Sequence, residues 1–273
     1  DVFARDPDGL GLMLYDPETD HVISGIKDID LGGMVYTVWT DHNHIYALME
    51  PAGYGPGRAT GGRGAGNLRR GALVAMRPFW VAKIDPDNWE VIKEYPLPGY
   101  RGTWAVIDSG NKFIYIAMSG SSGLTKLNIE TGEIVWTRGT GGGPFGITLS
   151  ADESEIWVAS KGENMGEFGR TISVLDTETG EFLATLFAAY EMDHVLLSPN
   201  GKEMWATSNG EGRILVYDSE TRELTKVIDM PQNGDAHGLV WVHYNEEGVS
   251  QVVRDQGGFH GNINPAQNMP LEY

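Results

Sequence analysis

The sequence predicts an all-β protein built from repeated four-stranded units, and two observations carry that prediction. A short polar turn recurs five times between apolar, strand-like runs. The five copies are Asp16–Thr19, Asp85–Asn88, Asn128–Thr131, Asp176–Thr179 and Asp218–Thr221. The chain also has 37 Gly and 13 Pro among its 273 residues, which is typical of many short strands joined by tight turns. Repetition at a regular period indicates stacked copies of one supersecondary unit.

Each recurring turn joins the last two strands of a unit, as between residues 172–175 and 181–187. The Asp or Asn that opens the turn can accept a hydrogen bond from the backbone two residues further on, and Gly180 supplies the positive φ that such a turn needs. The first two strands of a unit form a second hairpin, as at 146–149 and 156–159. Four strands per unit, repeated radially, are the pattern of a β-propeller.

The spacing of the turns predicts five blades. The turns begin at residues 16, 85, 128, 176 and 218, and the one long interval contains a Gly- and Arg-rich insertion at 51–77. We find no sequence for the additional blades of a six- or seven-bladed ring. The chain starts on the last two strands of a unit, at 11–26, and finishes on the first two, at 239–253. We therefore expect a single propeller domain over 1–273, in which the N- and C-terminal strands share one blade and a tail follows at 256–273.

Several of these segments are similar to a known group of repeats. The runs Ile172–Glu181, His194–Lys202 and Ala236–Leu239 resemble the YVTN and cytochrome-d1-like β-propeller repeats, and Glu130–Trp136 resembles the related quinoprotein repeats. The resemblance spans residues 10–255 and implies the propeller fold. It implies no single function, because the superfamily includes enzymes, electron-transfer modules and proteins without any chemistry.

The composition of the chain argues against some classes of binding partner. A formal net charge of -18 repels phosphate backbones, which argues against nucleic acid or an anionic membrane surface. Every apolar run is broken well short of the roughly 20 residues that a membrane span needs. The chain has no Cys, which excludes disulfides and thiolate metal sites. It begins with Asp1 rather than Met, so we expect a removed leader and an extracytoplasmic location, either periplasmic or secreted.

The candidate catalytic residues lie where the first strand of a blade begins, because that strand lines the channel of a propeller. Asp193 and His194 hold this position in one blade, His237 holds it in the next, and His260 follows the last predicted strand in a Gly-rich tail. Three imidazoles with an open coordination position suit zinc or copper, so His194, His237 and His260 are the expected metal ligands. Without a metal, Asp193, His194 and His237 would perform acid-base catalysis. In a third interpretation the histidines only bond neighbouring backbone.

Substrate-binding residues are expected at the same strand starts and in the insertion. Arg101, Trp104 and Phe145 would form an aromatic-walled pocket for a small molecule. The insertion 51–77 carries five Arg and no acidic residue, so Arg69 and Arg70 are expected to attract an anionic substrate. The same loop is also a candidate docking site for a protein partner, or a mobile linker.

We therefore expect an exported enzyme that acts on a small anionic molecule at the mouth of the channel. Both a metal-assisted oxidoreductase and a lyase fit the residues. Two alternatives remain: a non-catalytic, protein-binding propeller, and the propeller subunit of a multi-subunit redox enzyme.

Overall fold

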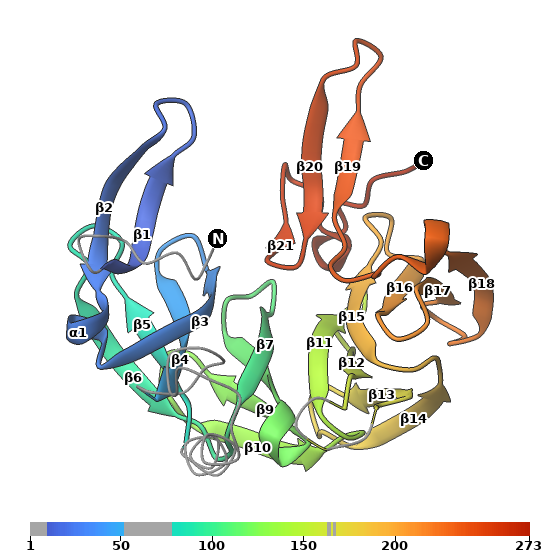
Figure 1. Cartoon of the computed structure of the whole chain (residues 1–273), viewed down its shortest axis with the longest axis horizontal. Helices are drawn as coiled ribbons and strands as arrows, with labels where there is room; N and C mark the ends of the chain where they lie inside the picture. The colour runs from blue at the N-terminus through green and yellow to red at the C-terminus, as the bar shows by residue number, and fades with distance from the viewer. Residues whose placement is uncertain (1–9, 52–77, 163–164, 166–167) are drawn as a thin grey trace. The chain divides into compact units, whose positions relative to one another are not determined.

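A computed structural model describes residues 10–51, 78–162, 165 and 168–273 (Figure 1). Most of the insertion 51–77, including Arg69 and Arg70, lies outside the described residues. The described residues form strands with a four-residue helix, α1 (Asp28–Leu31), and short 3-10 turns. Among these residues, no helix has the length and apolar character needed to cross a bilayer.

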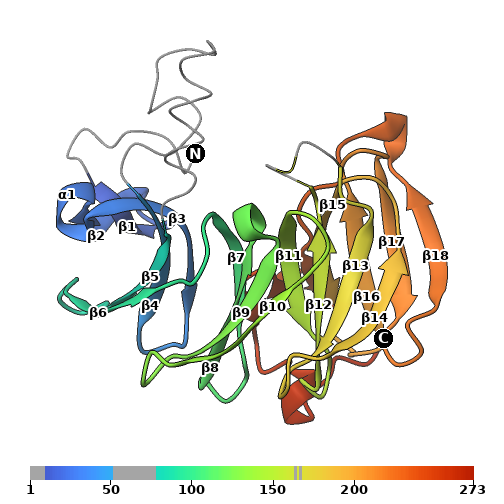
Figure 2. The same cartoon turned by 90° about the horizontal axis from the view of Figure 1, so that it is seen from below.

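Four complete blades follow one another along the chain, each a four-stranded antiparallel sheet with its strands in sequence order (Figure 2). Their strands are β3–β6 (Gly33–Thr40, Ile45–Pro51, Trp80–Ile84, Val91–Pro96), β7–β10 (Gly102–Ile107, Phe113–Met118, Gly123–Asn128, Ile134–Gly139), β11–β14 (Pro144–Leu149, Glu155–Ser160, Thr171–Asp176, Phe182–Phe187) and β15–β18 (Met192–Leu197, Glu203–Ser208, Arg213–Asp218, Leu224–Asp229).

The recurring turns have the chemistry that the sequence predicts. Asp176 Oδ1 accepts hydrogen bonds from the backbone N of Thr179 at 2.7 Å and from its hydroxyl at 2.8 Å. Asp218 accepts the same pair from Thr221. These bonds favour the charged carboxylates and lower the pKa of both. Gly180 closes its turn with a φ of 72°, a conformation that favours glycine.

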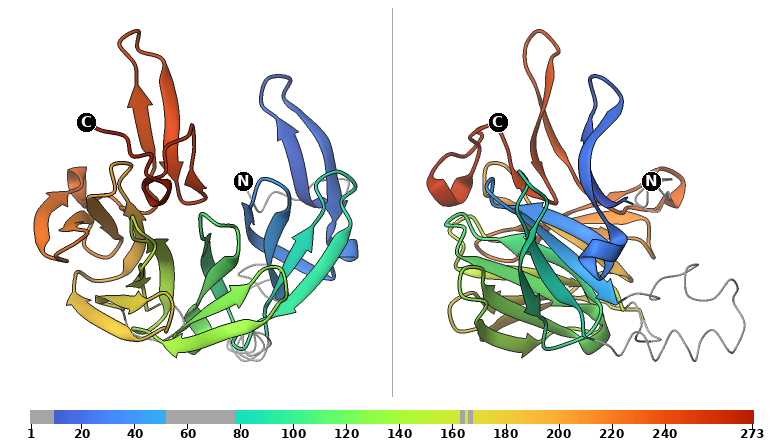
Figure 3. Two further views of the ribbon diagram at one scale, coloured as in Figure 1. Left: turned by 180° about the vertical axis from the view of Figure 1, so that it is seen from behind. Right: turned by 90° about the vertical axis from the view of Figure 1, so that its left-hand side faces the viewer.

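The strands expected for the fifth blade are present as two separate sheets (Figure 3). β1 (Leu10–Asp16) pairs with β2 (His21–Lys27), and β19 (Trp241–Tyr244) pairs with β20 (Ser250–Asp255). A short strand, β21 (Gly258–Phe259), adds to the other edge of β20. The all-β, five-bladed propeller class is thus confirmed. That the two terminal sheets share a single blade stays a prediction.

The chain divides into two compact units, the first ending at Arg101 and the second beginning at Gly102. In the second unit β11 lies between β7 and β15, so the first strands of three blades are neighbours. Apolar side chains fill the spaces between blades: Trp157, Leu197 and Tyr217 belong to one such cluster, and Tyr115 and Trp136 to the next. This packing fixes the strand that carries the candidate site, because every residue of β15 is buried.

Two tryptophans at matched positions of neighbouring blades test this packing. Trp157 is fully buried, whereas Trp205 is only partly buried and meets the Trp241 ring edge-on at 5.0 Å. We expect Trp157→Ala to lower the free energy of unfolding by about 3–5 kcal/mol, from lost burial and the cavity left behind. Trp205→Ala is expected to cost less, because part of its ring already faces water. Urea denaturation followed by near-UV circular dichroism measures both, and equal losses would contradict the difference in packing.

Candidate functional site

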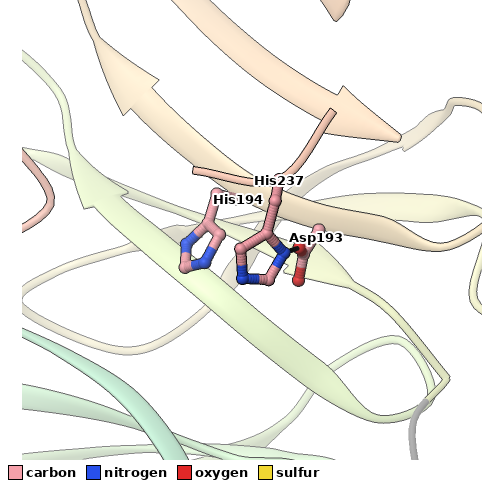
Figure 4. A group of neighbouring side chains, drawn as sticks. All are labelled: Asp193, His194 and His237. Carbon is pink, nitrogen blue, oxygen red and sulfur yellow. Dashed lines mark ion pairs between the residues drawn. The ribbon is translucent and has the colours of Figure 1, made fainter. Parts of the chain in front are cut away.

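Asp193, His194 and His237 come together in the second unit (Figure 4). Asp193 and His194 are the second and third residues of β15, and His237 lies in the segment between β18 and β19. One possible ligand atom from each side chain lies within 4.8 Å of the other two. The strand starts that the sequence singled out in neighbouring blades thus bring these three side chains into one group.

The Asp193 carboxylate is fully buried and is held by two partners. Oδ1 lies 3.1 Å from Lys161 Nζ, and Oδ2 pairs with His237 Nδ1. A buried carboxylate remains charged only when such partners compensate for its lost hydration. Lys161 also lies over the Phe145 ring, with Nζ 4.3 Å from its centre. The sequence analysis did not single out Lys161. One signal could have indicated Lys161. It directly follows β12, the second strand of its blade, and that strand ends on the rim where the first strands begin.

His194 is enclosed by aromatic rings. It is 2% exposed, and its ring lies 4.8 Å from the Trp104 ring, 5.3 Å from that of Phe145 and 5.2 Å from that of His237, centre to centre. Burial lowers the pKa of His194 to about 4, although the charge of Asp193 acts in the opposite direction. The imidazole is therefore neutral at pH 7. Its Nδ1 is buried and has no hydrogen-bond partner among the described residues. A neutral imidazole with a free nitrogen is the form that binds a metal or accepts a proton.

One hydroxyl fixes the backbone of both histidines. Thr207 Oγ1, on β16, accepts a hydrogen bond from His194 N at 3.0 Å and donates one to His237 O at 2.7 Å. His237 is the most exposed member of the group, with 57% of its side chain accessible. Because Nδ1 faces Asp193, Nε2 is the ring nitrogen left for a ligand or a proton.

A glycine on the neighbouring strand makes room for the group. Gly146, on β11, lies so close to β15 that a Cβ there would be 2.5 Å from His194 Cα and 2.7 Å from both Asp193 O and His194 Nδ1. Real Cβ atoms do not approach other atoms this closely. The absence of a side chain at Gly146 therefore allows the two first strands to meet at the site.

Of the other predicted site residues, some lie beside this group and some do not. Trp104 and Phe145 flank His194, and their role in substrate binding stays a prediction. His260 is not part of the group: its backbone N donates to Val253 O, and its Nε2 pairs with Asp255 at 3.1 Å. The three-ligand set found among the described residues therefore includes Asp193 in place of His260. Arg101 is the last residue of the first unit.

The buried His194 predicts acid sensitivity. A histidine in the unfolded chain has a pKa near 6.5, so as pH falls from about 6.5 towards 4 the unfolded state gains a proton that the folded state does not. We expect stability to fall over this range by up to about 3 kcal/mol from this residue. His194→Gln should flatten this part of the pH dependence, measured by denaturation in the presence of a chelator. His260→Gln is the matched control and should keep the wild-type slope. An unchanged slope in His194→Gln would contradict the prediction.

The close packing at Gly146 predicts that adding a side chain there lowers stability. Gly146→Ala should force β11 and β15 apart, with a cost of about 1–3 kcal/mol as in other overpacked sites. Gly139→Ala is the control, because nothing lies within 4 Å of a Cβ at that strand position. Thermal denaturation compares the two variants. Equal stability of both would show that the neighbouring strands adjust without strain.

Comparison with known proteins supports the fold but does not indicate a function. No family and no curated protein matches the sequence. Among solved structures, the chain is similar to a chain of hydrazine synthase from Kuenenia stuttgartiensis, with a TM-score of 0.50 and 19% sequence identity. The match covers 63% of this chain and half the length of that one. At this identity the likeness shows a shared fold alone.

Proposed function

We propose that the protein is an enzyme whose active centre is the group Asp193, His194 and His237, and that this group binds a divalent transition metal to act on a small anionic molecule. The observation that carries the proposal is the convergence of two imidazoles and one carboxylate within 4.8 Å. Zinc in catalytic sites and non-haem iron both use two His and one carboxylate, and copper also accepts imidazole. Three protein ligands leave positions for water or substrate.

The surroundings support a metal centre in two ways. His194 is already neutral, so binding an ion displaces no proton from it. Lys161 pairs with Asp193 Oδ1, and this contact orients the carboxylate as a ligand. A bound metal would supply Lewis-acid or redox chemistry, and Lys161 adds positive charge that favours an anionic substrate. We propose a metal-assisted oxidoreductase or lyase.

A second candidate is acid-base catalysis without a metal, and the ion pair between Asp193 and His237 favours it. A buried carboxylate at Nδ1 orients the imidazole and stabilises its protonated form, so that Nε2 acts as a general base. In this case the neutral His194 forms one wall of the substrate site.

Metal titration separates the two candidates. After treatment with a chelator, we expect the wild-type protein to bind one equivalent of Zn²⁺, measured by isothermal titration calorimetry and by elemental mass spectrometry. His194→Ala and His237→Ala should lose this binding, because each removes one of three ligands. His260→Ala is the matched control and should bind like the wild type.

Two results would reject the metal centre. If the wild-type protein binds none of Zn²⁺, Cu²⁺ or Fe²⁺, or if His260→Ala weakens binding as much as His194→Ala, the metal centre is rejected. Failure of all three metals leaves the acid-base candidate.

A further inference from the structure

Arg254 is a buried cation whose hydrogen bonds are incomplete among the described residues. It lies on β20, is 5% exposed, and its guanidinium carbon lies 4.0 Å from the centre of the Phe259 ring. One terminal nitrogen, Nη2, donates a hydrogen bond to Thr148 Oγ1 at 2.9 Å. Among the described residues Nε has no hydrogen-bond partner, and no carboxylate forms an ion pair with Arg254. Burying a donor without an acceptor is costly, so the free Nε–H favours a further ligand.

Arg254 remains charged in this environment. Burial lowers its pKa to about 10, while the more distant charges of Asp255 and Glu153 raise it. The guanidinium is therefore protonated at pH 7. Asp255 and Glu153 offset part of this charge, but the Nε–H still has no acceptor among the described residues. This free donor is available to an anion supplied from outside the chain.

Two connections place Arg254 beside the metal-binding group. Thr148 is two residues along β11 from Gly146, and Gly146 contacts His194. Residues two apart share one face of a strand at a separation of about 7 Å. On the other side, the backbone O of Gln256 accepts a hydrogen bond from Trp104 Nε1 at 3.4 Å, and the Trp104 ring meets His194. The β20–β21 segment thus brings Arg254 and Gln256 to the wall of the same site.

Gln256 adds a second group without a partner. Its side-chain amide approaches His194 closely enough to oppose the lowering of the pKa of that histidine by burial. Both its nitrogen and its oxygen are nevertheless buried without a hydrogen bond of ordinary geometry to any described residue. A buried polar atom without a partner is costly, and Gln256 follows Arg254 by two residues along the chain. Unsatisfied polar atoms of Arg254, Gln256 and His194 therefore belong to segments that contact one another through Trp104 and β11.

We propose that Arg254 and Gln256 form an anion-binding pocket for a small carboxylate or inorganic oxyanion, next to Asp193, His194 and His237. The assignment of this anion as a substrate rests on the proposed function, whereas its binding does not require a metal. The free Nε–H and the planar guanidinium suit oxygen anions, and the Gln256 amide donates a further hydrogen bond. The burial of Arg254 restricts the ligand to small molecules.

Anion binding to chelated, metal-free protein tests the pocket. Isothermal titration calorimetry and thermal shift are measured with formate, acetate, oxalate and inorganic phosphate, at constant ionic strength set with chloride. We expect saturable binding of at least one of these anions with one site per chain. The carboxylates and phosphate are separate arms, so the more tightly bound arm identifies the class of anion.

Three variants separate anion binding from a structural role. Arg254→Met should weaken binding about 10-fold or more, because a charge-assisted hydrogen bond is lost, and Gln256→Met should weaken it less. Thr148→Val removes the contact that fastens Arg254 to β11 and should still bind the anion. Arg213→Met is the matched control, since Arg213 is already paired with Glu211 and Asp229. It should bind like the wild type.

The proposal is overturned if the wild-type protein binds none of the four anions at millimolar concentration, or if Arg254→Met binds them as well as the wild type. If Arg254→Met does not fold, Gln256→Met decides, and unchanged binding by that variant rejects the pocket. Because the titrations use metal-free protein, they succeed or fail independently of the Zn²⁺ titration. Anion binding without metal binding would keep the pocket and reject the metal centre.

Discussion

The candidate site depends on one buried carboxylate. Asp193 has no contact with water, and Lys161 and His237 lie at its two oxygens. Each of the three groups comes from a different part of the second unit: β15, the residue after β12, and the segment before β19. One ion-pair network therefore joins strands and loops that hydrogen bonds within a sheet do not connect. Loss of Lys161 or His237 removes one of the two partners of a fully buried carboxylate.

The chemistry of the site follows from unequal burial of two neighbouring imidazoles. His194 is enclosed by Trp104 and Phe145 and stays neutral, while His237 is largely exposed and lies against a carboxylate. The two rings therefore differ in exposure although their centres are only 5.2 Å apart. Burial keeps His194 neutral, and a neutral imidazole is the form that binds an ion or accepts a proton.

The sequence could predict features that local chemistry determines. The turns at Asp176 and Asp218 are visible because a short side chain bonds its own backbone, and their regular spacing gives the number of blades. Asp193, His194 and His237 were predicted as candidates because they lie at, or shortly before, the first strands of neighbouring blades. Lys161, Arg254 and Gln256 were missed, since their importance arises from contacts with distant segments and no short motif marks them. His260 was expected as a ligand, but its backbone hydrogen bond to Val253 O holds it beside β20. There its imidazole pairs with Asp255.

The contribution of β20 and β21 to the wall of the site has a consequence for how the protein is made. The ribosome synthesises β15 well before the segment that contains His237, Arg254 and Gln256. A nascent chain that ends at β18 already contains three consecutive blades of the second unit, but of the two ion-pair partners of Asp193 it contains only Lys161. The proposed ligand sites would thus be complete only once the last sheet is made, and a metal or anion that binds them would favour the folded chain by mass action.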